Sequence, residues 1–286
     1  MIEEDPKSKP YFINVLIRLS KNKSALLGAA ILLLFTIASV FAPLLATHPI
    51  NEMNYGESLA GPSSSHFLGT DEFGRDLFSR ILYGGRVSLL MGLVVVSIAG
   101  TVGVLLGVIA GYFRKIDIFI MQCVDVLLAL PSLLLAIVIV AILGVGLTNA
   151  MIAVAIAVIP SFVRVVRGSV LSVRESEYVE AARALGVKNH KIIFKHILPN
   201  IASPIIILAT LEFGSAILAA ASLSFLGLGA QPPNPEWGAL VYVGKSFLSQ
   251  AWWMTVFPGL CIMLVVLGFN LLGDGLRDAL DPRLKL

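Results

Sequence analysis

The chain has 286 residues, of which 57% are hydrophobic and only 14% are charged, and its formal net charge is +3. Soluble domains contain roughly 45–50% apolar residues, so this composition excludes a soluble globular protein. Lipid accepts such a chain if every backbone group is paired inside helices or a closed barrel, and uninterrupted runs of about 20 apolar residues favour helices. The sequence therefore predicts an all-α, polytopic membrane protein. Its small net charge is typical of basic loops beside a membrane and gives no reason to expect a nucleic-acid partner.

Six apolar runs are predicted to be transmembrane helices. They cover about Ser24–Ala46, Val87–Gly111, Ile118–Leu143, Leu147–Val166, Ile201–Ala221 and Thr255–Leu272. The first run is longer than the apolar core of a signal peptide and is followed by no small-residue cleavage site, so the N-terminus is expected to stay attached. The division of the chain follows: an N-terminal lead at 1–23, the first span at 24–46, an outer loop at 47–86, a five-helix core at 87–272 with an inner loop at 167–200, and a tail at 273–286.

Lysine and arginine are distributed very unevenly over the loops. If the N-terminus is cytoplasmic, the inner segments contain 17 of the 21 basic residues. The outer loops contain Arg75, Arg80, Arg86 and Lys245. Because basic residues accumulate on the cytoplasmic side of membrane proteins, both termini and the loop 167–200 are predicted to be cytoplasmic.

The two polar segments that flank the first span have helical patterns. In the lead, Phe12, Val15, Leu16 and Leu19 share one stripe, which is compatible with a helix on the inner membrane surface or with a frayed tail. In the outer loop, "HFLGTDEFGRDLFSRILYGGRVSLL" places Phe73, Leu77, Phe78 and Ile81 on one side, and predicts an amphipathic surface helix. Its other side carries Asp71, Arg75, Asp76 and Arg80, which are expected to pair at the surface rather than to bind a metal ion or a phosphate.

Small residues and prolines mark the spans. Gly103, Gly107 and Gly111 recur at every fourth position and predict close contact with another helix. Prolines interrupt four further spans, at Pro131, Pro160, Pro204 and Pro258. They are compatible with bent helices around a pathway or with kinked structural spans.

The inner loop contains a short amphipathic pattern. Tyr178, Ala181, Ala182 and Leu185 follow i, i+3, i+4, i+7 spacing and form one apolar stripe. Alanines in the middle of the stripe allow close approach, so a helix that docks onto a partner is predicted, with an amphipathic loop on lipid as the alternative. Gly186 stands at the position of a helix C-cap, a second helix of about nine residues is expected after it, and Pro199 marks the return to the bilayer.

At these residues the sequence resembles the integral permease subunits of ATP-binding-cassette importers. Their signature is EAA, three residues, G, nine residues, I, any residue and LP, and it is matched by Glu180, Ala181, Ala182, Gly186, Leu198 and Pro199. One position departs from it, because His196 occupies the isoleucine position and Ile197 follows it. This departure puts in doubt only the fit of the second helix. The resemblance implies that Tyr178–Leu185 is a coupling helix that fits a groove on an ATPase subunit.

The resemblance extends from about Phe67 to Leu284. "LGTDEFGRDLFSRILYGGRVSLL", "DVLLALPSLLLAI", "LSFLGLGAQPPNPEWG" and "NLLGDGLRDALDP" are similar to the second permease subunit of the dipeptide, oligopeptide and nickel branch. The branch has a glutamate shortly before "LSFLGLG", where this chain has Ala220. A transport role tied to that acid is not carried over.

The resemblance implies a six-span fold of the type I importer class and a set of partners. These are a homologous second permease, two cytoplasmic ATPase subunits that bind ATP and Mg²⁺, and an extracytoplasmic solute-binding protein. The chain itself is expected to bind no cofactor or metal and to catalyse no reaction. "GALVYVGKS" imitates a phosphate loop, yet five residues separate Gly238 from Gly244 instead of four, and the segment is expected on the outer side.

Two acidic residues fall within the predicted spans. A charge near the bilayer centre costs about 2.5–3.5 kcal/mol on insertion scales, so such groups usually face water, a partner or a pathway. Glu212 is the first candidate for the translocation path, with an inter-subunit hydrogen bond as the alternative. Asp125 is the second candidate, although it lies close enough to the inner surface to pair with a cytoplasmic base.

The segment "SLSFLGLGAQPPNPEWG", after the fifth span, is compatible with a hinged re-entrant gate or with a rigid surface loop. Trp252 and Trp253 are expected at the outer membrane interface.

Taken together, the sequence predicts a multi-pass inner-membrane permease that imports di- or oligopeptides, with nickel, glutathione or an opine as alternative cargo. An ion-coupled secondary transporter is disfavoured because the spans contain few acids and no clear inverted repeat. An intramembrane enzyme is disfavoured because HExxH and GxSxG are missing and all four histidines lie outside the predicted spans.

Overall fold

The computed structural model describes residues 11–280, without the side chains of residues 11–14 and 16. The predicted tail residues Arg283 and Lys285, and the side chains of Phe12 and Leu16, lie outside the described part. The regular elements of residues 11–280 are all helical. In chain order they are α1 (Tyr11–Lys21), α2 (Lys23–Val40), α3 (Ala42–Leu45), η1 (Tyr55–Glu57), α4 (Leu77–Tyr112), α5 (Arg114–Leu128), α6 (Ser132–Leu143), α7 (Leu147–Arg174), α8 (Glu177–Ala184), α9 (Asn189–Ile192), η2 (Ile193–Ile197), η3 (Leu198–Ile201), α10 (Ala202–Phe225), α11 (Trp237–Gly244), η4 (Lys245–Phe247) and α12 (Trp253–Leu280).

The described residues contain five helices that are long and apolar enough to cross a membrane. They contain a sixth span if α5 and α6 are counted as one, since these two helices pass the same test together but are bent by 92°. The break falls at Pro131, which forms the N-cap of α6 and, as a proline, cannot donate a helical hydrogen bond. The all-α, multi-span prediction is confirmed, and the third predicted span is broken in two.

The other prolines differ in position. Pro160 and Pro258 lie inside α7 and α12. Pro204 lies in the first turn of α10, where a proline removes no internal helical hydrogen bond. The candidate span Asn189–Phe225 changes from a π segment through a 3₁₀ turn to the α-helix just before Pro204, so its regular helix is interrupted next to the predicted position.

The predicted surface helix of the outer loop is wrong in extent and in exposure. Helix α4 begins at Leu77, after the N-cap Asp76, and continues for 36 residues, so the amphipathic pattern is the first part of the second span. The residues before it form an irregular segment in which Gly69 and Gly74 adopt positive φ angles of 80° and 72°. The paired charges are buried rather than superficial, because the segment before α11, α11 itself and the start of α12 lie against them. Asp71, Arg75, Asp76 and Arg80 are each at most 5% exposed, and Asp71 pairs with Arg75 at 2.7 Å.

The glycine repeat fits α4 tightly against α7, as predicted. A Cβ atom on Gly107 would come within 2.7 Å of the Val166 Cβ, and one on Gly111 within 2.6 Å of the Val170 Cβ. Gly103 faces Phe162 in the same way. The two helices therefore approach closely along a stripe that extends to the end of α4.

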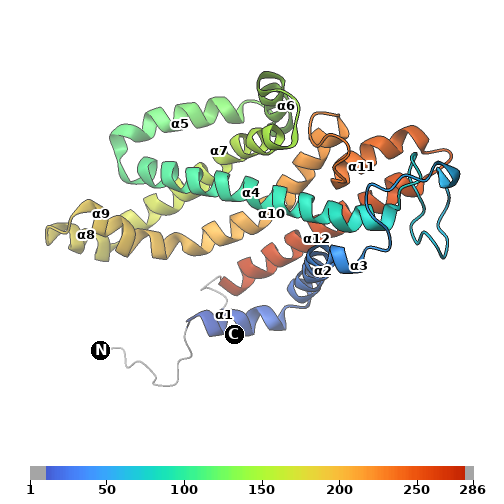
Figure 1. Ribbon diagram of the computed structural model, residues 1–286. Coiled ribbons are helices and arrows are strands. Elements are labelled where there is room, and N and C mark those ends of the chain that lie inside the picture. The colour runs from blue at the N-terminus through green and yellow to red at the C-terminus, as the bar shows by residue number, and fades with distance from the viewer. Residues whose placement is uncertain (1–10, 281–286) are drawn as a thin grey trace.

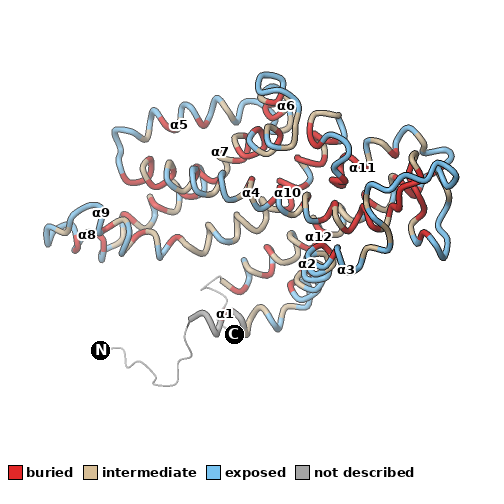
Figure 2. The backbone as a smooth tube through the Cα atoms, in the orientation of Figure 1, coloured by how far each residue is buried: buried red, intermediate tan, exposed pale blue. Residues whose placement is uncertain are grey.

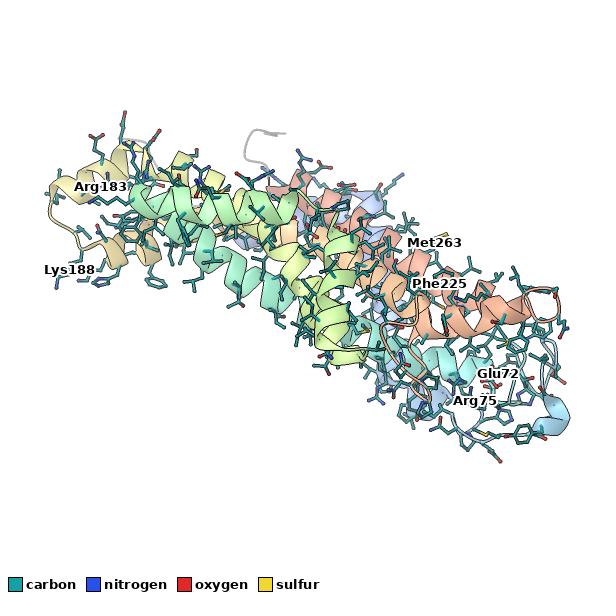
Figure 3. The ribbon with its side chains drawn as sticks, turned by 90° about the horizontal axis from the view of Figure 1, so that it is seen from above. Glu72, Arg75, Arg183, Lys188, Phe225 and Met263 are labelled. Carbon is teal, nitrogen blue, oxygen red and sulfur yellow. The ribbon has the colours of Figure 1, made fainter. Side chains whose placement is uncertain are left out.

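The helices form an elongated bundle whose two ends carry different loops. Figure 1 shows α8 and α9 projecting at one end, whereas the segment between α3 and α4 lies at the other. Figure 3 gives the same separation, with Arg183 and Lys188 at one end and Glu72 and Arg75 near the other. The start of α2 lies beside the end of α12, because the Asn22 side chain donates a 3.2 Å hydrogen bond to Asp278. Buried residues concentrate where helices meet, and many outward-facing residues of α2, α5 and α6 are exposed (Figure 2), as expected for lipid or a second subunit.

Candidate functional site: the loop that carries α8 and α9

Helix α8 presents an apolar face to solvent. Tyr178 and Leu185 are 47% and 84% exposed, and Ala181 between them is also exposed. Ala182 differs from the prediction, since it is 8% exposed and lies on the inward face with the fully buried Val179. The exposed surface formed by Tyr178, Ala181 and Leu185 is called the α8 face below.

Buried aliphatic side chains attach the loop to the bundle. Val179 of α8, Ile192 of α9 and Ile197 of η2 are fully buried. They belong to one cluster with side chains of α4 and α7, namely Val108, Tyr112, Val166 and Val170. Each large aliphatic side chain gains about 1.5–3 kcal/mol on burial. The α8 face is therefore exposed on a helix whose other side is held firmly to two long helices.

The turn after α8 has the predicted form. Gly186 adopts a φ angle of 74°, which a residue with a side chain adopts only at a cost. The Val187 amide donates to the Ala182 carbonyl at 3.1 Å, as in a glycine-terminated helix end. The second helix comprises the four residues of α9 and the five of η2, and Leu198 and Pro199 start the short turn before α10. His196 is half-buried, whereas Ile197 is fully buried.

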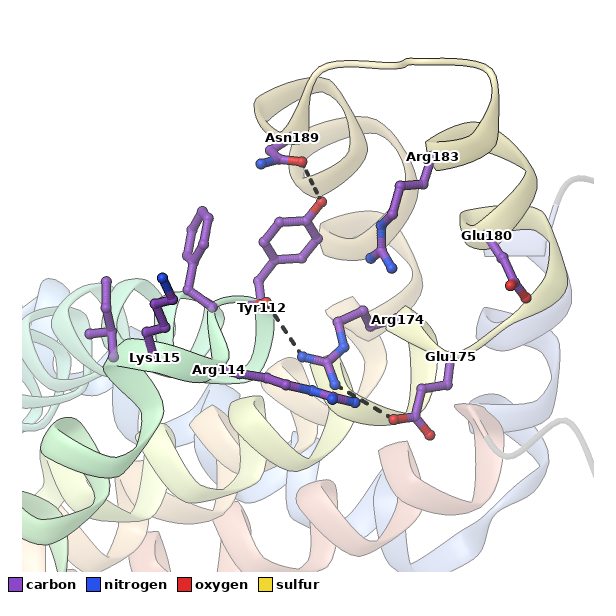
Figure 4. Close-up of a pocket in the computed structure, with 10 residues that line it drawn as sticks. Tyr112, Arg114, Lys115, Arg174, Glu175, Glu180, Arg183 and Asn189 are labelled. Atoms are coloured by element: carbon purple, nitrogen blue, oxygen red, sulfur yellow. Dashed lines mark hydrogen bonds and ion pairs between the residues drawn. The ribbon is translucent and has the colours of Figure 1, made fainter.

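A cavity of about 700 Å³ separates α8 and α9 from the start of α5 (Figure 4). On one wall, the Tyr112 hydroxyl donates a 2.8 Å hydrogen bond to Asn189 Oδ1. On the other, the buried Arg174 donates a 2.9 Å hydrogen bond to the Gly111 carbonyl at the end of α4, and Arg183 stands over the Tyr112 ring at 5.9 Å. Tyr112 thus connects the end of α4 to the projecting loop, and Arg174 connects the same end of α4 to α7.

The two intramembrane acids occupy different surroundings. Glu212 lines a second cavity, of about 230 Å³, together with Ser132, Ser161 and Ser215 from α6, α7 and α10. Asp125 is exposed and accepts a 2.8 Å hydrogen bond from Arg164 of α7, in agreement with the expected pairing to a nearby base. A second pair that the sequence reasoning missed, Asp117 and Arg167, also joins α5 to α7. Its signal was a second acid, at 117, and a second base, at 167, near the two residues of the first pair.

The segment before α11 is held by two buried residues. Glu236, at the N-cap of α11, is 1% exposed and accepts hydrogen bonds from the Gly238 amide at 2.8 Å, the Ala239 amide at 2.9 Å and the Ser88 hydroxyl at 3.1 Å. Burial raises the pKa of its carboxyl, and these hydrogen bonds oppose that rise. The fully buried Trp237 donates to the Ile81 carbonyl at 2.9 Å. These contacts support the rigid alternative for this segment over the hinged one.

The two tryptophans that were expected at the outer membrane interface differ in exposure. Trp252 is 49% exposed, but Trp253 is buried and donates a hydrogen bond to the Thr70 carbonyl at 3.1 Å, so Trp253 is a packing residue beneath the outer segment. Ala220 is buried within α10. Phe194, which the sequence reasoning passed over, is 70% exposed on the projecting loop. Its signal in the sequence was weak, since Phe194 follows two isoleucines in the stretch KIIFKH.

Several apolar spans, one of them broken, with a short helix projecting from one end, define a multi-span helical membrane protein. The fold resembles a chain of the MetNI methionine ABC transporter in inward-facing conformations, with a TM-score of 0.57, 21% identity and coverage of 70% of this chain and 96% of that chain. A second crystal form of the same transporter gives a TM-score of 0.58.

The chain belongs to the family of binding-protein-dependent transport system inner membrane components, whose model matches residues 103–286. The model of the N-terminal transmembrane domain of oligopeptide transport permease C matches residues 11–62. The chain is 55% identical to the dipeptide transport system permease protein DppC of Alkalihalophilus pseudofirmus, over 94% of this chain and 88% of that protein. It is 49% identical to the glutathione transport system permease protein GsiD of Pectobacterium atrosepticum, over 90% of this chain and 86% of that protein.

Proposed function

We propose that this chain forms half of the translocation pathway of an ATP-driven importer for short peptides in the inner membrane. The cargo is supported by the 55% identity to a dipeptide permease and by 48% identity to a di/tripeptide permease of Pseudomonas aeruginosa. A homologous second permease completes the pathway, two ATPase subunits bind ATP and Mg²⁺, and an external binding protein delivers the solute. The permease itself catalyses no reaction.

The observation that carries this proposal is the α8 face. Large apolar side chains are exposed at its ends, with an alanine between them, on a helix whose opposite side is anchored by Val179. A partner can therefore bind α8 closely and move it without detaching it from the bundle. Because the loop is joined to the ends of α4 and α7, movement of a bound ATPase would be transmitted to the spans. Binding of a cytoplasmic ATPase to α8 requires the loop to be on the cytoplasmic side of the membrane, and the proposed topology places both termini on the same side.

Glu212 is proposed to line the path. It faces a cavity that three serines share, and a carboxyl among hydroxyl groups is suited to hold water or the amino group of a peptide. Glu212→Gln keeps the size of the side chain and removes its charge, so we expect slower peptide uptake with ATP hydrolysis retained. Asp125→Asn, in the exposed pair with Arg164, is the matched control and should leave uptake near the wild-type rate. Equal uptake by the Glu212→Gln variant and the wild type would remove Glu212 from the path.

The cargo is tested by uptake in proteoliposomes that contain the complete transporter. A radiolabelled dipeptide is offered with ATP inside the vesicle lumen that corresponds to the cytoplasm, and glutathione or Ni²⁺ is added as competitor. We expect dipeptide uptake that requires ATP and resists both competitors. Glutathione is the second candidate because of the 49% identity to GsiD. Transport of glutathione but not of the dipeptide would reverse the assignment, and uptake that survives ATP removal but collapses with an ionophore would reject the importer class.

A further inference from the structure

Two histidines and an aspartate meet at the end of the bundle opposite α8, where the segment after α3 crosses the start of α4. His66 Nδ1 lies 2.9 Å from Asp76 Oδ1, and His48 Nδ1 lies 3.8 Å from the same oxygen. The two imidazole rings are 4.6 Å apart. One ligand atom from each of the three residues lies within 4.8 Å of the other two. The three residues come from one irregular stretch between α3 and α4, at positions 48, 66 and 76, and their spacing matches no metal-site motif.

The cluster is buried except on the side of His48, which solvent can reach. The Asp76 side chain is fully buried, the His66 side chain is 7% exposed, and the His48 side chain is 37% exposed. His48 therefore gives a path from solvent to two ligand atoms that are already fixed. The fixed ligands are held on their far sides, because Asp76 Oδ2 accepts hydrogen bonds from the Ser79 amide at 2.8 Å and the Thr47 hydroxyl at 3.2 Å.

The second ring nitrogen of His66, Nε2, also contacts a carboxylate. His66 Nε2 lies 3.2 Å from Glu57 Oε2, and a carboxylate can only accept, so Nε2 carries a proton. The Nδ1 atom lies 2.9 Å from the Asp76 oxygen, so either a proton on Nδ1 or a cation bound to both atoms must lie between them. A carboxylate that orients the outer ring nitrogen of a histidine is the usual support of a metal ligand.

We propose that His48, His66 and Asp76 bind one divalent cation of the zinc class, with Glu57 orienting His66. Zinc takes histidine nitrogen and carboxylate oxygen ligands at about 2.0–2.2 Å, which places tetrahedral ligands about 3.3–3.6 Å from one another. The two distances to Asp76 Oδ1, 2.9 and 3.8 Å, lie on either side of that range, so small side-chain movements complete the site. Three protein ligands leave a fourth position for water. Mg²⁺ and Ca²⁺ prefer sites made of oxygen atoms and are disfavoured here.

The cation would cross-link two parts of the outer end. The Thr47 and His48 amides both donate to the Ser79 hydroxyl, each at 3.1 Å, so the chain after α3 already lies against the first turn of α4. A metal bound to His48 and Asp76 would fasten these same two segments. A ligand that binds only the folded state raises the melting temperature, so the site should stabilise this end of the protein.

The test uses the full-length chain, purified in detergent without a polyhistidine tag and dialysed against Zn²⁺ at neutral pH. We expect one more bound Zn²⁺ per chain than in His48→Ala, whose half-exposed side chain can be removed without opening the core. His190→Ala, which removes an exposed histidine of the α9 helix, is the matched control and should bind as the wild type does. Glu57→Gln should weaken Zn²⁺ binding by about tenfold, and a tenfold excess of Mg²⁺ should not compete.

A second measurement separates binding from a folding defect. Zn²⁺ should raise the melting temperature of the wild type and of His190→Ala, but not that of His48→Ala, when all three melt at similar temperatures in a chelator. Equal Zn²⁺ binding by wild type and His48→Ala would overturn the proposal. So would a wild type that binds no Zn²⁺, because a proton alone would then bridge His66 and Asp76.

Discussion

The hydroxyl of Tyr112, the last residue of α4, donates a 2.8 Å hydrogen bond to the side chain of Asn189, the first residue of α9. This bond joins a membrane-crossing helix to the loop that carries the α8 face, in one wall of the cavity of Figure 4. It lies beside the contact of Arg174 with the Gly111 carbonyl. The end of α4 is therefore bonded both to the projecting loop, through Asn189, and to the end of α7, through Arg174, which is the connection that coupling would require.

The Tyr112–Asn189 bond should contribute measurably to stability. Tyr112→Phe keeps the ring against its buried neighbours and removes only the donor, so we expect a loss of about 0.5–1.5 kcal/mol. Asn189→Ala should cost a similar amount, and the double variant should cost less than the sum because both changes remove the same bond. Thermal unfolding of the purified protein measures all three. Strictly additive losses would mean that the two side chains do not interact.

The size of residue 181 should control coupling. Ala181 is exposed in the middle of the α8 face, so Ala181→Arg should leave the melting temperature unchanged and obstruct a partner that approaches closely. We expect at least a tenfold lower peptide uptake per ATP hydrolysed, the factor that about 1.4 kcal/mol of lost binding energy produces. Ala181→Ser is the matched control, because its side chain is nearly as small. Normal uptake by both variants would contradict the docking role of α8.

A side chain at Gly186 should be unfavourable because of the backbone conformation there and not because of crowding. An added Cβ at Gly186 meets no atom within 4 Å, but the φ angle of 74° disfavours one. Gly186→Ala should therefore destabilise the loop by about 1 kcal/mol. Gly168, inside α7, is equally open but has no positive φ, so Gly168→Ala should be neutral or stabilising by up to about 1 kcal/mol. Faster amide hydrogen exchange in residues 177–197 would show that the loop is loosened. If Gly186→Ala and Gly168→Ala changed the stability in the same direction, this explanation would be refuted.

Close packing of α4 on α7 should make Gly107 intolerant of any side chain. In Gly107→Ala the new Cβ would come within 2.7 Å of the Val166 Cβ, and overpacking of this kind costs about 1–3 kcal/mol. Gly100→Ala is the control on the same helix, since its Cβ would meet Phe162 at 3.6 Å, an ordinary contact distance. Melting temperatures should fall for Gly107→Ala and stay near that of the wild type for Gly100→Ala. An unchanged melting temperature in Gly107→Ala would show that the two helices can separate without cost.

The sequence by itself determined the features that depend on local pattern. Apolar runs define spans because lipid requires internally bonded helices, the spacing of Gly103, Gly107 and Gly111 indicated a close helix contact, and Gly186 marked a helix end. The family signature at Glu180 and Pro199 identified the inner loop. Each of these is a property of neighbouring residues, so no knowledge of distant contacts was needed.

Only the tertiary structure decided which polar residues are buried and what they contact. Asp71 and Arg75 were predicted at the surface but lie beneath other segments, and Ala182 turns inward although it shares the stripe of Ala181. His48, His66 and Asp76 meet only because the chain after α3 folds back against α4. Burial and side-chain proximity depend on packing between segments that are far apart in the sequence, and a single amphipathic pattern is equally compatible with lipid, solvent or a neighbouring helix.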